Sequence, residues 1–167
     1  FFNTWKRTHL NVKGLELEIC NESLISKNHK LLCLIQAYNE GHHIQKTLNH
    51  LSQHCDGIIL LDDGSTDETF KKAEHPALVM KARKKRNKFN DLENRNILLK
   101  LSNLASSEWL MFADADERFD SHFPSPVSYT DSQEDIISFR LIHLWDRENT
   151  YRTDYPYSNK GIQEKYR

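Results

Sequence analysis

The stretch IILLDDGSTD, residues 58–67, passes directly from a continuous apolar run into an acidic turn that contains a glycine. A run of four apolar residues without polar alternation is typical of a strand that is buried on both faces, as in parallel sheets. Residues 31–35, LLCLI, form a second such run, and apolar residues recur at helical spacing between residues 44 and 55. This strand–helix–strand order predicts parallel pairing through a right-handed crossover.

The same alternation continues along the chain. We predict further strands at residues 77–80, at 109–113 and within 135–144, and further helices that open at Ser65–Glu68, by a capping box, and at Asn90–Glu93. Leu98, Leu101 and Ala105 share one face of the last helix. The fold class that follows is an α/β sandwich, with a mainly parallel central sheet flanked by helices.

The two ends of the chain follow this pattern less well. Leu15, Leu17 and Ile19 alternate with two glutamates, which indicates a half-exposed edge strand in an N-terminal extension over residues 1–28. Residues 121–134 contain two prolines and several serines and are predicted to form a loop.

Composition excludes several classes of protein. The chain has 167 residues, which fits one domain, and its net charge of −1 supplies no field that would draw it onto nucleic acid. No apolar stretch approaches the roughly 20 residues that span a membrane, and the N-terminus lacks the order of a secretory signal. Three cysteines without C-x-x-C spacing favour reduced thiols, so we expect a cytoplasmic protein. Only five glycines disfavour P-loop and dinucleotide fingerprints.

Polar clusters follow three of the predicted strands: QAYNE at residues 36–40, DDGSTD at 62–67 and DADE at 114–117. Because parallel strands end at one edge of a sheet, we expect the clusters to converge there. Asp114 and Asp116 are two residues apart, so in extended backbone both carboxylates point to one side and can hold Mg²⁺ or Mn²⁺. The structural alternatives are an acidic surface turn and, for the second cluster, a strand-to-helix turn that Ser65 caps.

The order of these motifs resembles that of the family 2 glycosyltransferases. The resemblance rests on Tyr38-Asn39-Glu40, on residues 62–69, on Arg95-Asn96 and on Asp114-Ala115-Asp116, and it covers roughly residues 29–120. It implies the GT-A fold and a nucleotide-diphospho-sugar donor, usually with inversion at the anomeric carbon. The acceptor would be a saccharide or lipid-linked hydroxyl in cell-surface polysaccharide or glycolipid synthesis.

The resemblance also implies roles for the residues that would contact the nucleoside. Tyr38 would stack on the base, and Gln36 and Glu40 would lie beside the base and ribose. Asp63 would accept a hydrogen bond from the base, as in relatives that use uridine, so a UDP-sugar is favoured.

A second group would handle the diphosphate. Arg95 would face it, since a guanidinium gives bidentate contact to phosphate oxygens. Asp114 would lie near the ribose or the metal, and Asp116 would be the principal ligand of Mn²⁺ or Mg²⁺. The cation would neutralise the leaving diphosphate, which the bare carboxylates would repel.

Two sets of charged or titratable residues have more than one interpretation. The basic run over residues 81–88 is either a solvated loop, a nucleic-acid patch without interleaved aromatic residues, or a site for an anionic acceptor or lipid head group. The last alternative allows peripheral contact at the inner face of a membrane. His43, His50 and His54 share one side of a helix, where a half-exposed face is favoured over a zinc site because no third ligand is evident.

An inverting transferase needs a general base to deprotonate the acceptor hydroxyl. Asp146 and Asp154 are the candidates, because residues 121–167 resemble only the start of the family's acceptor-binding half, of which part is expected to be missing. Residues 29–120 would then be the nucleotide-sugar-binding half. The alternatives are a fragment that binds nucleotide and metal without turnover and, more weakly, a sugar-nucleotidyltransferase, since no glycine-rich phosphate loop follows the first strand.

Overall fold

The computed structural model describes residues 9–12, 14–139, 141, 144–145 and 147–151. These residues belong to two compact units, Phe1–Ser132 and Gln133–Arg167, which are described separately below. The predicted base candidates Asp146 and Asp154 lie outside the described residues.

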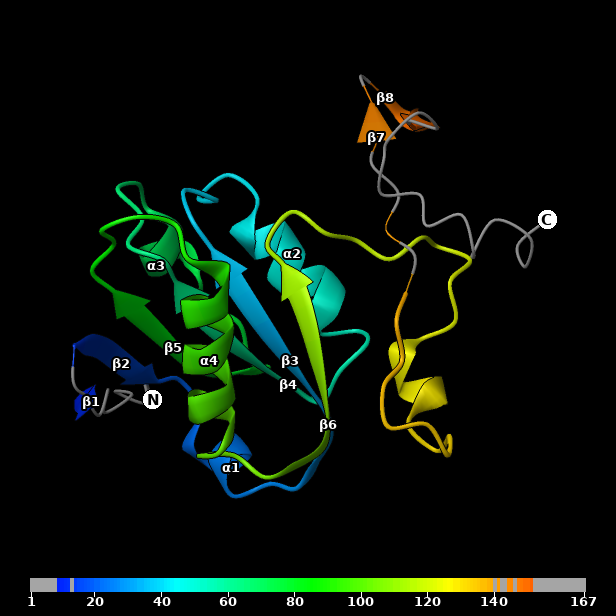
Figure 1. The fold of residues 1–167 in the computed structure, drawn as a ribbon, viewed down its shortest axis with the longest axis horizontal. Helices are drawn as coiled ribbons and strands as arrows, with labels where there is room; N and C mark the ends of the chain where they lie inside the picture. The colour runs from blue at the N-terminus through cyan, green and yellow to red at the C-terminus, as the bar shows by residue number, and fades with distance from the viewer. Residues whose placement is uncertain (1–8, 13, 140, 142–143, 146, 152–167) are drawn as a thin grey trace, which may run out of the picture. The chain divides into compact units, whose positions relative to one another are not determined.

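The first unit is built on a six-stranded sheet in the order β1-β2-β5-β4-β3-β6 (Figure 1). Its strands are β1 His9–Val12, β2 Leu15–Ile19, β3 His29–Ala37, β4 Gly57–Asp62, β5 Leu78–Lys84 and β6 Ser107–Asp114. Strands β5, β4, β3 and β6 are parallel to their neighbours, whereas β2 pairs antiparallel with β5 and β1 pairs antiparallel with β2. The mainly parallel α/β sheet is therefore confirmed.

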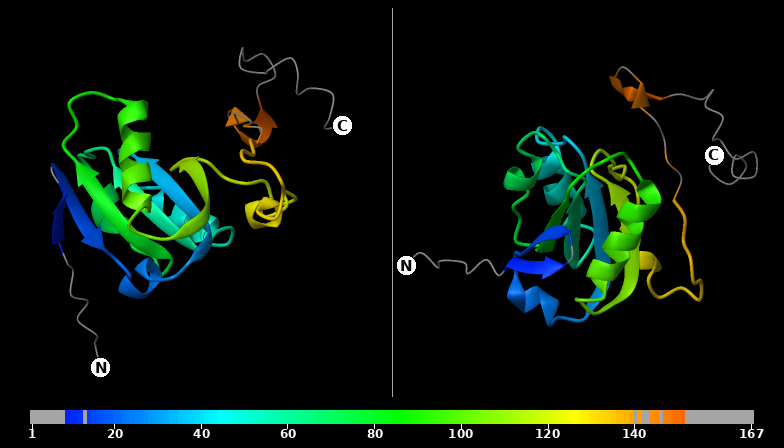
Figure 2. Two further views of the ribbon diagram at one scale, coloured as in Figure 1. Left: turned by 60° about the horizontal axis from the view of Figure 1, so that its bottom comes forward. Right: turned by 60° about the vertical axis from the view of Figure 1, so that its left-hand side comes forward.

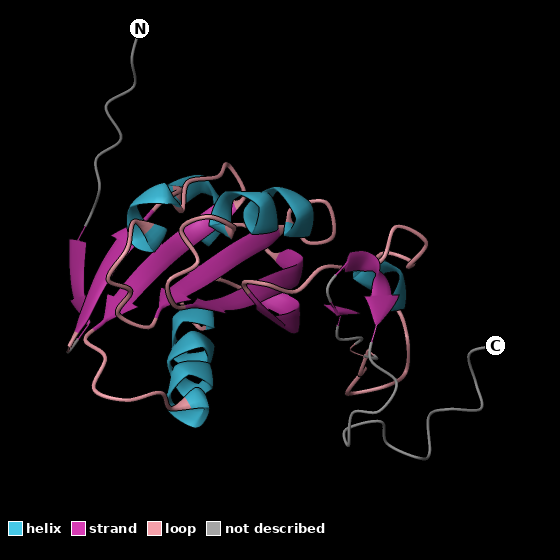
Figure 3. Cartoon of the chain, turned by 90° about the horizontal axis from the view of Figure 1, so that it is seen from above, coloured by secondary structure: helices cyan, strands magenta, loops and turns pink. Residues whose placement is uncertain are grey.

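Helices cover both faces of this sheet. They are α1 Glu22–Ile25, α2 Ile44–Leu51, α3 Thr69–Lys72 and α4 Asp91–Ser102. Helices α2 and α3 lie on one face and α4 on the other (Figure 3).

Strand β3 shows why its sequence is a continuous apolar run. Leu31, Cys33 and Ile35 pack into the core under α2, while Leu32 and Leu34 pack into the core under α4. The strand therefore needs apolar side chains on both faces. The predicted apolar face of α4 is also confirmed, because Leu98, Leu101 and Ala105 are buried in this second core.

Helix starts follow the sequence signals only in part. Helix α4 begins at this segment as predicted, and the side chain of Asn90 caps it by accepting a hydrogen bond from the backbone N–H of Glu93 at 3.2 Å. The capping box at Ser65–Glu68 is wrong, because α3 begins only at Thr69, whose N–H donates to the Asp67 carboxylate. The Ser65 hydroxyl is used elsewhere, as an acceptor for the backbone N–H of Asn39.

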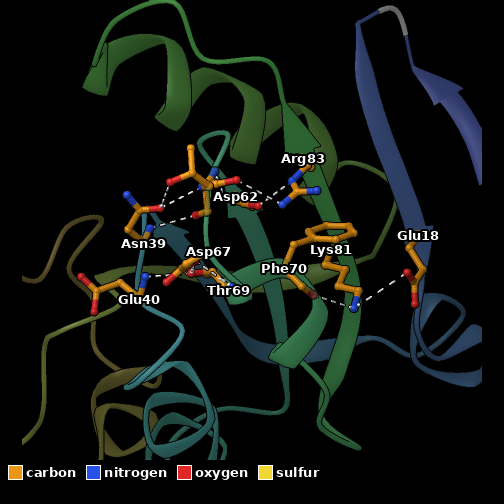
Figure 4. A network of polar contacts seen from close by, with 11 residues as sticks. Glu18, Asn39, Glu40, Asp62, Asp67, Thr69, Phe70, Lys81 and Arg83 are labelled. Atoms are coloured by element: carbon orange, nitrogen blue, oxygen red, sulfur yellow. Dashed lines mark hydrogen bonds and ion pairs between the residues drawn. The ribbon is translucent and has the colours of Figure 1, made fainter.

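The basic run over residues 81–88 corrects the predicted end of the third strand at residue 80 and the alternative of a solvated loop. Strand β5 continues to Lys84, so the first half of the run is a central strand and cannot be a solvated loop. Lys81 is only 2% exposed, and its ammonium group donates to the carbonyls of Phe70 and Ala73 and lies 3.8 Å from a Glu18 carboxylate oxygen (Figure 4).

Strand β2 is not an edge strand, because β1 covers its outer side (Figure 2). Glu18 is buried beside Lys81, its register partner on β5, whereas the sequence alternation predicted a half-exposed strand. The ammonium group of Lys81 compensates the buried charge of this carboxylate.

The second unit contains an antiparallel pair, β7 Leu144–Trp145 and β8 Arg147–Tyr151. The predicted strand within residues 135–144 is wrong for its described part before Leu144, which is not assigned to a strand and where Ile136 and Leu141 are exposed. The predicted loop over 121–134 holds one 3₁₀ turn, η1 Pro126–Tyr129.

Across the described chain, the helices are all too short or too polar to cross a bilayer.

We expect Lys81→Met to lower the free energy of unfolding by about 3 kcal/mol, because it removes the positive charge beside the buried Glu18. Urea unfolding measures the change. Lys71→Met is the matched control, since Lys71 is 83% exposed beside Glu68 and its loss should cost less than about 0.5 kcal/mol. Equal effects of the two substitutions would contradict the assigned role of Lys81.

Candidate functional site

The three polar clusters meet at the carboxyl ends of adjacent strands, as the sequence predicted. Strand β3 lies between β4 and β6, and its register places Ala37 beside Asp62 and Gln36 beside Asp114. The loops that leave these strands therefore start side by side, at the edge where parallel sheets bind ligands.

The loop after β3 is tied to the loop after β4 through Asn39 (Figure 4). Its backbone N–H donates to the Ser65 hydroxyl at 2.9 Å, and its side-chain oxygen accepts from the Thr66 N–H at 2.9 Å. Asn39 has a φ of 57°, a left-handed conformation that asparagine tolerates better than most residues. This residue therefore shapes the site without needing to touch a ligand.

Asp67 and Thr69 hold the next residues of the same loop. The backbone N–H of Glu40 donates to the Thr69 hydroxyl at 2.8 Å, and that of Gly41 donates to the Asp67 carboxylate at 3.0 Å. Burial acts to raise the pKa of Asp67, but hydrogen bonds from Thr69 and Gly41 outweigh it and lower the pKa. A Cβ on Gly41 would lie 2.8 Å from this carboxylate, so a larger residue there would push the Asp67 side chain aside.

The two aspartates after β4 have different environments. Asp62 is fully buried and accepts hydrogen bonds from the Ser65 N–H at 2.8 Å and from Arg83 at 2.9 Å. Asp63 is 2% exposed and lies 3.1 Å from the Lys84 ammonium group, yet neither carboxylate oxygen accepts a hydrogen bond within the described residues. Asp62 thus builds the turn, whereas Asp63 is held, among the described residues, only by its ion pairs with Lys84 and Arg86.

Tyr38 and Asp63 both contact the side chain of Arg86. The Tyr38 side chain is exposed, and the guanidinium carbon of Arg86 lies 3.4 Å from the centre of its ring. The same guanidinium lies 3.6 Å from the Asp63 carboxylate. Sequence reasoning placed Arg86 only within the basic run, because its partners are distant in the chain.

Gln36 joins strand β6 to helix α4. Its amide nitrogen donates to Asp114 at 2.8 Å and to Asp91 at 2.9 Å, and its oxygen accepts from Asn94 at 3.2 Å. Asp91 in turn accepts from Arg95 Nε at 2.9 Å, and this hydrogen bond is the main cause of the lowered pKa of Asp91. The network therefore brings the predicted residues Arg95 and Asp114 to the same side of the sheet.

Asp114 and Asp116 do not share a face of extended backbone, which corrects the prediction. Strand β6 ends at Asp114, and the next two residues form a turn in which the N–H of Glu117 donates to the Asp114 carbonyl at 3.1 Å. Asp116 is exposed on this turn. Burial raises the pKa of Glu40, and the negative charge of Asp116 raises it further. The carboxylates of Glu40 and Asp116 therefore repel each other.

A cation could relieve this repulsion, since carboxylate oxygens are the ligands that Mg²⁺ and Mn²⁺ prefer. Within the described ranges, however, no three His, Cys, Asp or Glu side chains converge into a complete metal site. Among the described residues, Asp114 ends β6 and Asp116 follows it, and both carboxylates could contribute to the coordination of such an ion.

Helix α2 holds the turn after β6 at two points. The Thr47 hydroxyl donates to the carbonyl of Ala115, between the two aspartates, and His50 Nε2 accepts from the Phe119 N–H at 2.9 Å. Burial, followed by the charge of His54 and that of Arg118, lowers the pKa of His50 and favours the neutral ring that this bond requires. Neither role was predicted, because three strands, β4, β5 and β6, separate α2 from this turn along the chain.

The four parallel strands and the polar loops at their carboxyl ends define a Rossmann-like α/β domain of the GT-A type. Comparison with family models agrees, since the model described as Glycosyl transferase family 2 matches residues 33–165. The chain belongs to this family.

Curated relatives extend well beyond the matched region. The chain is 36% identical to the SPbeta prophage-derived glycosyltransferase SunS of Bacillus subtilis over 91 residues, which are 53% of this chain and 20% of that protein. It is equally similar to glycosyltransferase SunS of Bacillus phage SPbeta. It is 24% identical to an uncharacterized protein of Mycobacterium bovis over 126 residues, 70% of this chain and 31% of that protein. The chain thus spans less than a third of these relatives.

We expect Asn39→Ala to destabilise the protein by about 1–2 kcal/mol. It removes the hydrogen bond to the Thr66 N–H, and alanine tolerates the positive φ of this position less well than asparagine does. Asn39→Gly keeps the backbone relaxed and loses only the side-chain bonds, so it should cost less. Thermal or urea unfolding of both variants measures the difference. A larger loss for glycine than for alanine would contradict the conformational part of this account.

The neutral state of His50 predicts a pH dependence of stability. Because the folded pKa of His50 is lowered, the unfolded chain binds more protons, and stability is lost as pH falls below about 6.5. His50→Gln retains an acceptor for the Phe119 N–H and should lose less stability between pH 7.5 and pH 5, by urea unfolding. The exposed His42→Gln is the control and should keep the parent's decline. An unchanged slope in His50→Gln would remove His50 as a contributor.

Proposed function

We propose that this chain is the donor-binding part of a glycosyltransferase that moves a sugar from a nucleotide-diphospho-sugar to a hydroxyl acceptor. One observation carries the proposal. The Asp63 carboxylate is buried at the ligand-binding edge of the sheet, and neither of its oxygens accepts a hydrogen bond within the described residues. Membership of the family supports a nucleotide-sugar as the ligand.

The base would stack on Tyr38 and donate an N–H to Asp63. A uracil ring offers one imide N–H for a single carboxylate, which favours a UDP-sugar. Glu40 would lie beside the ribose. The amide of Gln36 is already bonded to Asp114, Asp91 and Asn94, so its support for the site would be to hold Asp114 in place.

The diphosphate would lie between α4 and the turn after β6. Arg95 uses Nε for Asp91, and its two terminal nitrogens make no hydrogen bond within the described residues, so they could bind phosphate oxygens. Asp116, with Asp114, would hold Mn²⁺ or Mg²⁺, and that ion would neutralise charge on the leaving diphosphate. The exposure of Asp116 and its repulsion with Glu40 support this assignment.

The acceptor hydroxyl would be deprotonated by a carboxylate of the second unit. Asp146 or Asp154 would act as the base of an inverting mechanism, and a saccharide or lipid-linked hydroxyl would be the acceptor. A chain that binds nucleotide and metal without turnover is the second candidate, because it spans only 20% of SunS. A sugar-nucleotidyltransferase is a weaker third.

A thermal-shift panel of UDP, GDP, dTDP and CDP, each with Mn²⁺ or EDTA, tests the donor site. A ligand at 100 times its dissociation constant stabilises the fold by about 2.7 kcal/mol. We expect a shift with UDP that is largest with Mn²⁺, and Asp116→Asn should lose the metal-dependent part. Asp120→Asn is the control, because this exposed carboxylate lies on the same segment and bonds only to His122 among the described residues.

Three outcomes separate the candidates. Release of UDP from a UDP-sugar indicates a transferase, and nucleotide binding without turnover indicates the binding fragment. Release of pyrophosphate from a nucleoside triphosphate and a sugar phosphate indicates the nucleotidyltransferase. No shift with any nucleotide would overturn the proposed donor site.

A further inference from the structure

We propose that the guanidinium of Arg86 occupies the nucleobase position in the ligand-free protein, and that the base must displace it. The inference rests on the proposed donor site. It assigns a specific function to Arg86, which the sequence showed only as one charge of the basic run.

Arg86 makes the two contacts that a base would make. Its guanidinium carbon lies 3.4 Å from the centre of the Tyr38 ring, which is within stacking distance, and its Nε lies 3.6 Å from an Asp63 carboxylate oxygen. A guanidinium resembles a nucleobase in being planar and in presenting N–H donors along its edge. A base that stacks on this face of Tyr38 and donates to Asp63 therefore competes directly with Arg86.

The guanidinium is held loosely enough to leave. The 3.6 Å separation from Asp63 is longer than a hydrogen bond, and Nη1 of Arg86 is buried with no hydrogen-bond partner in the described structure. Lys84 lies closer to Asp63, at 3.1 Å, so the buried carboxylate keeps a positive neighbour when Arg86 moves. Displacement therefore costs no uncompensated charge.

A second aromatic ring lies within reach of the displaced side chain. The guanidinium of Arg86 is already 5.9 Å from the centre of the Phe89 ring, and Phe89 is 60% exposed. A cation can lie over such a ring at little cost. Arg86 could then remain at the mouth of the site and cover the outer side of a bound base.

The backbone fixes where Arg86 starts. Gly64 has a φ of +72°, and a Cβ at this position would lie 2.8 Å from both the backbone nitrogen and the Cβ of Arg86. Only glycine lets the turn after Asp63 approach Arg86 so closely. The position of Arg86 is thus part of the fold of the motif.

Arg86 differs in this respect from its neighbours in the run. Lys81 is buried against helix α3, Arg83 bonds to Asp62, and Lys84 lies between Asp63 and Glu93. These three charges hold the structure together. Lys88 is exposed and makes no hydrogen bond or ion pair to another described residue, so it provides a matched control.

Calorimetric titration of the whole chain with uridine tests the inference, because uridine is neutral and the loss of a positive charge cannot weaken its binding through simple attraction. Arg86→Gln should bind uridine about 3- to 10-fold more tightly than the parent, which corresponds to a base site that Arg86 fills roughly 70–90% of the time. Lys88→Gln should leave the affinity unchanged. Arg86→Lys keeps the charge but cannot stack as a plane, so it should fall between the parent and Arg86→Gln.

Titration with UDP separates a failure of this inference from a failure of the proposed function. If the parent binds UDP but Arg86→Gln binds uridine equally or less tightly, Arg86 is a ligand or a bystander and the inference is overturned. A gain in Lys88→Gln equal to that in Arg86→Gln would also overturn it. If neither the parent nor any variant binds a nucleoside diphosphate, the donor site fails and the inference fails with it.

Discussion

The neutralisation of two adjacent buried carboxylates, Asp62 and Asp63, is the constraint on which the rest of the structure depends. Asp62 ends the central strand β4 and Asp63 follows it directly, and the two residues are 0% and 2% exposed. Ionised groups at that depth are tolerated only with opposite charges beside them. Strand β5 supplies those charges, because its register places Arg83 beside Asp62 and its last residue, Lys84, 3.1 Å from Asp63. The basic run and the acidic motif are therefore two halves of one arrangement.

The motifs at the sheet edge contain residues of two kinds. One kind forms hydrogen bonds within and between the loops and so fixes the backbone of the site before any ligand binds. These residues are Asn39, Ser65, Asp67 and Thr69. In the proposed function, Tyr38, Asp63 and Asp116 are the side chains that contact the ligand. Helix α2 adds the same kind of support to the turn after β6, through Thr47 and His50. Such pre-organisation is what a binding site gains from a rigid scaffold.

Sequence patterns predicted elements well wherever one local signal decided the outcome. The apolar runs of β3 and β4 and the Asn90 cap of α4 are examples, because burial on both faces and capping act within a few residues. The capping box at Ser65 failed because the Ser65 hydroxyl bonds to Asn39, which is 26 residues away. Charged residues in β2 and β5 indicated exposure, yet Glu18 and Lys81 compensate each other in the interior. A local pattern cannot report a partner on another strand.

By itself, the sequence determined the α/β class, the order of the strands along the chain and the convergence of the polar clusters at one edge. These follow from apolar periodicity and from the geometry of parallel strands, which do not depend on distant contacts. Tertiary structure alone decided which charges are buried, how the turn separates Asp114 from Asp116, and that Arg86 lies over Tyr38. Those features depend on strand register and on the close approach of Gly64 to Arg86, and both exist only once the sheet has formed.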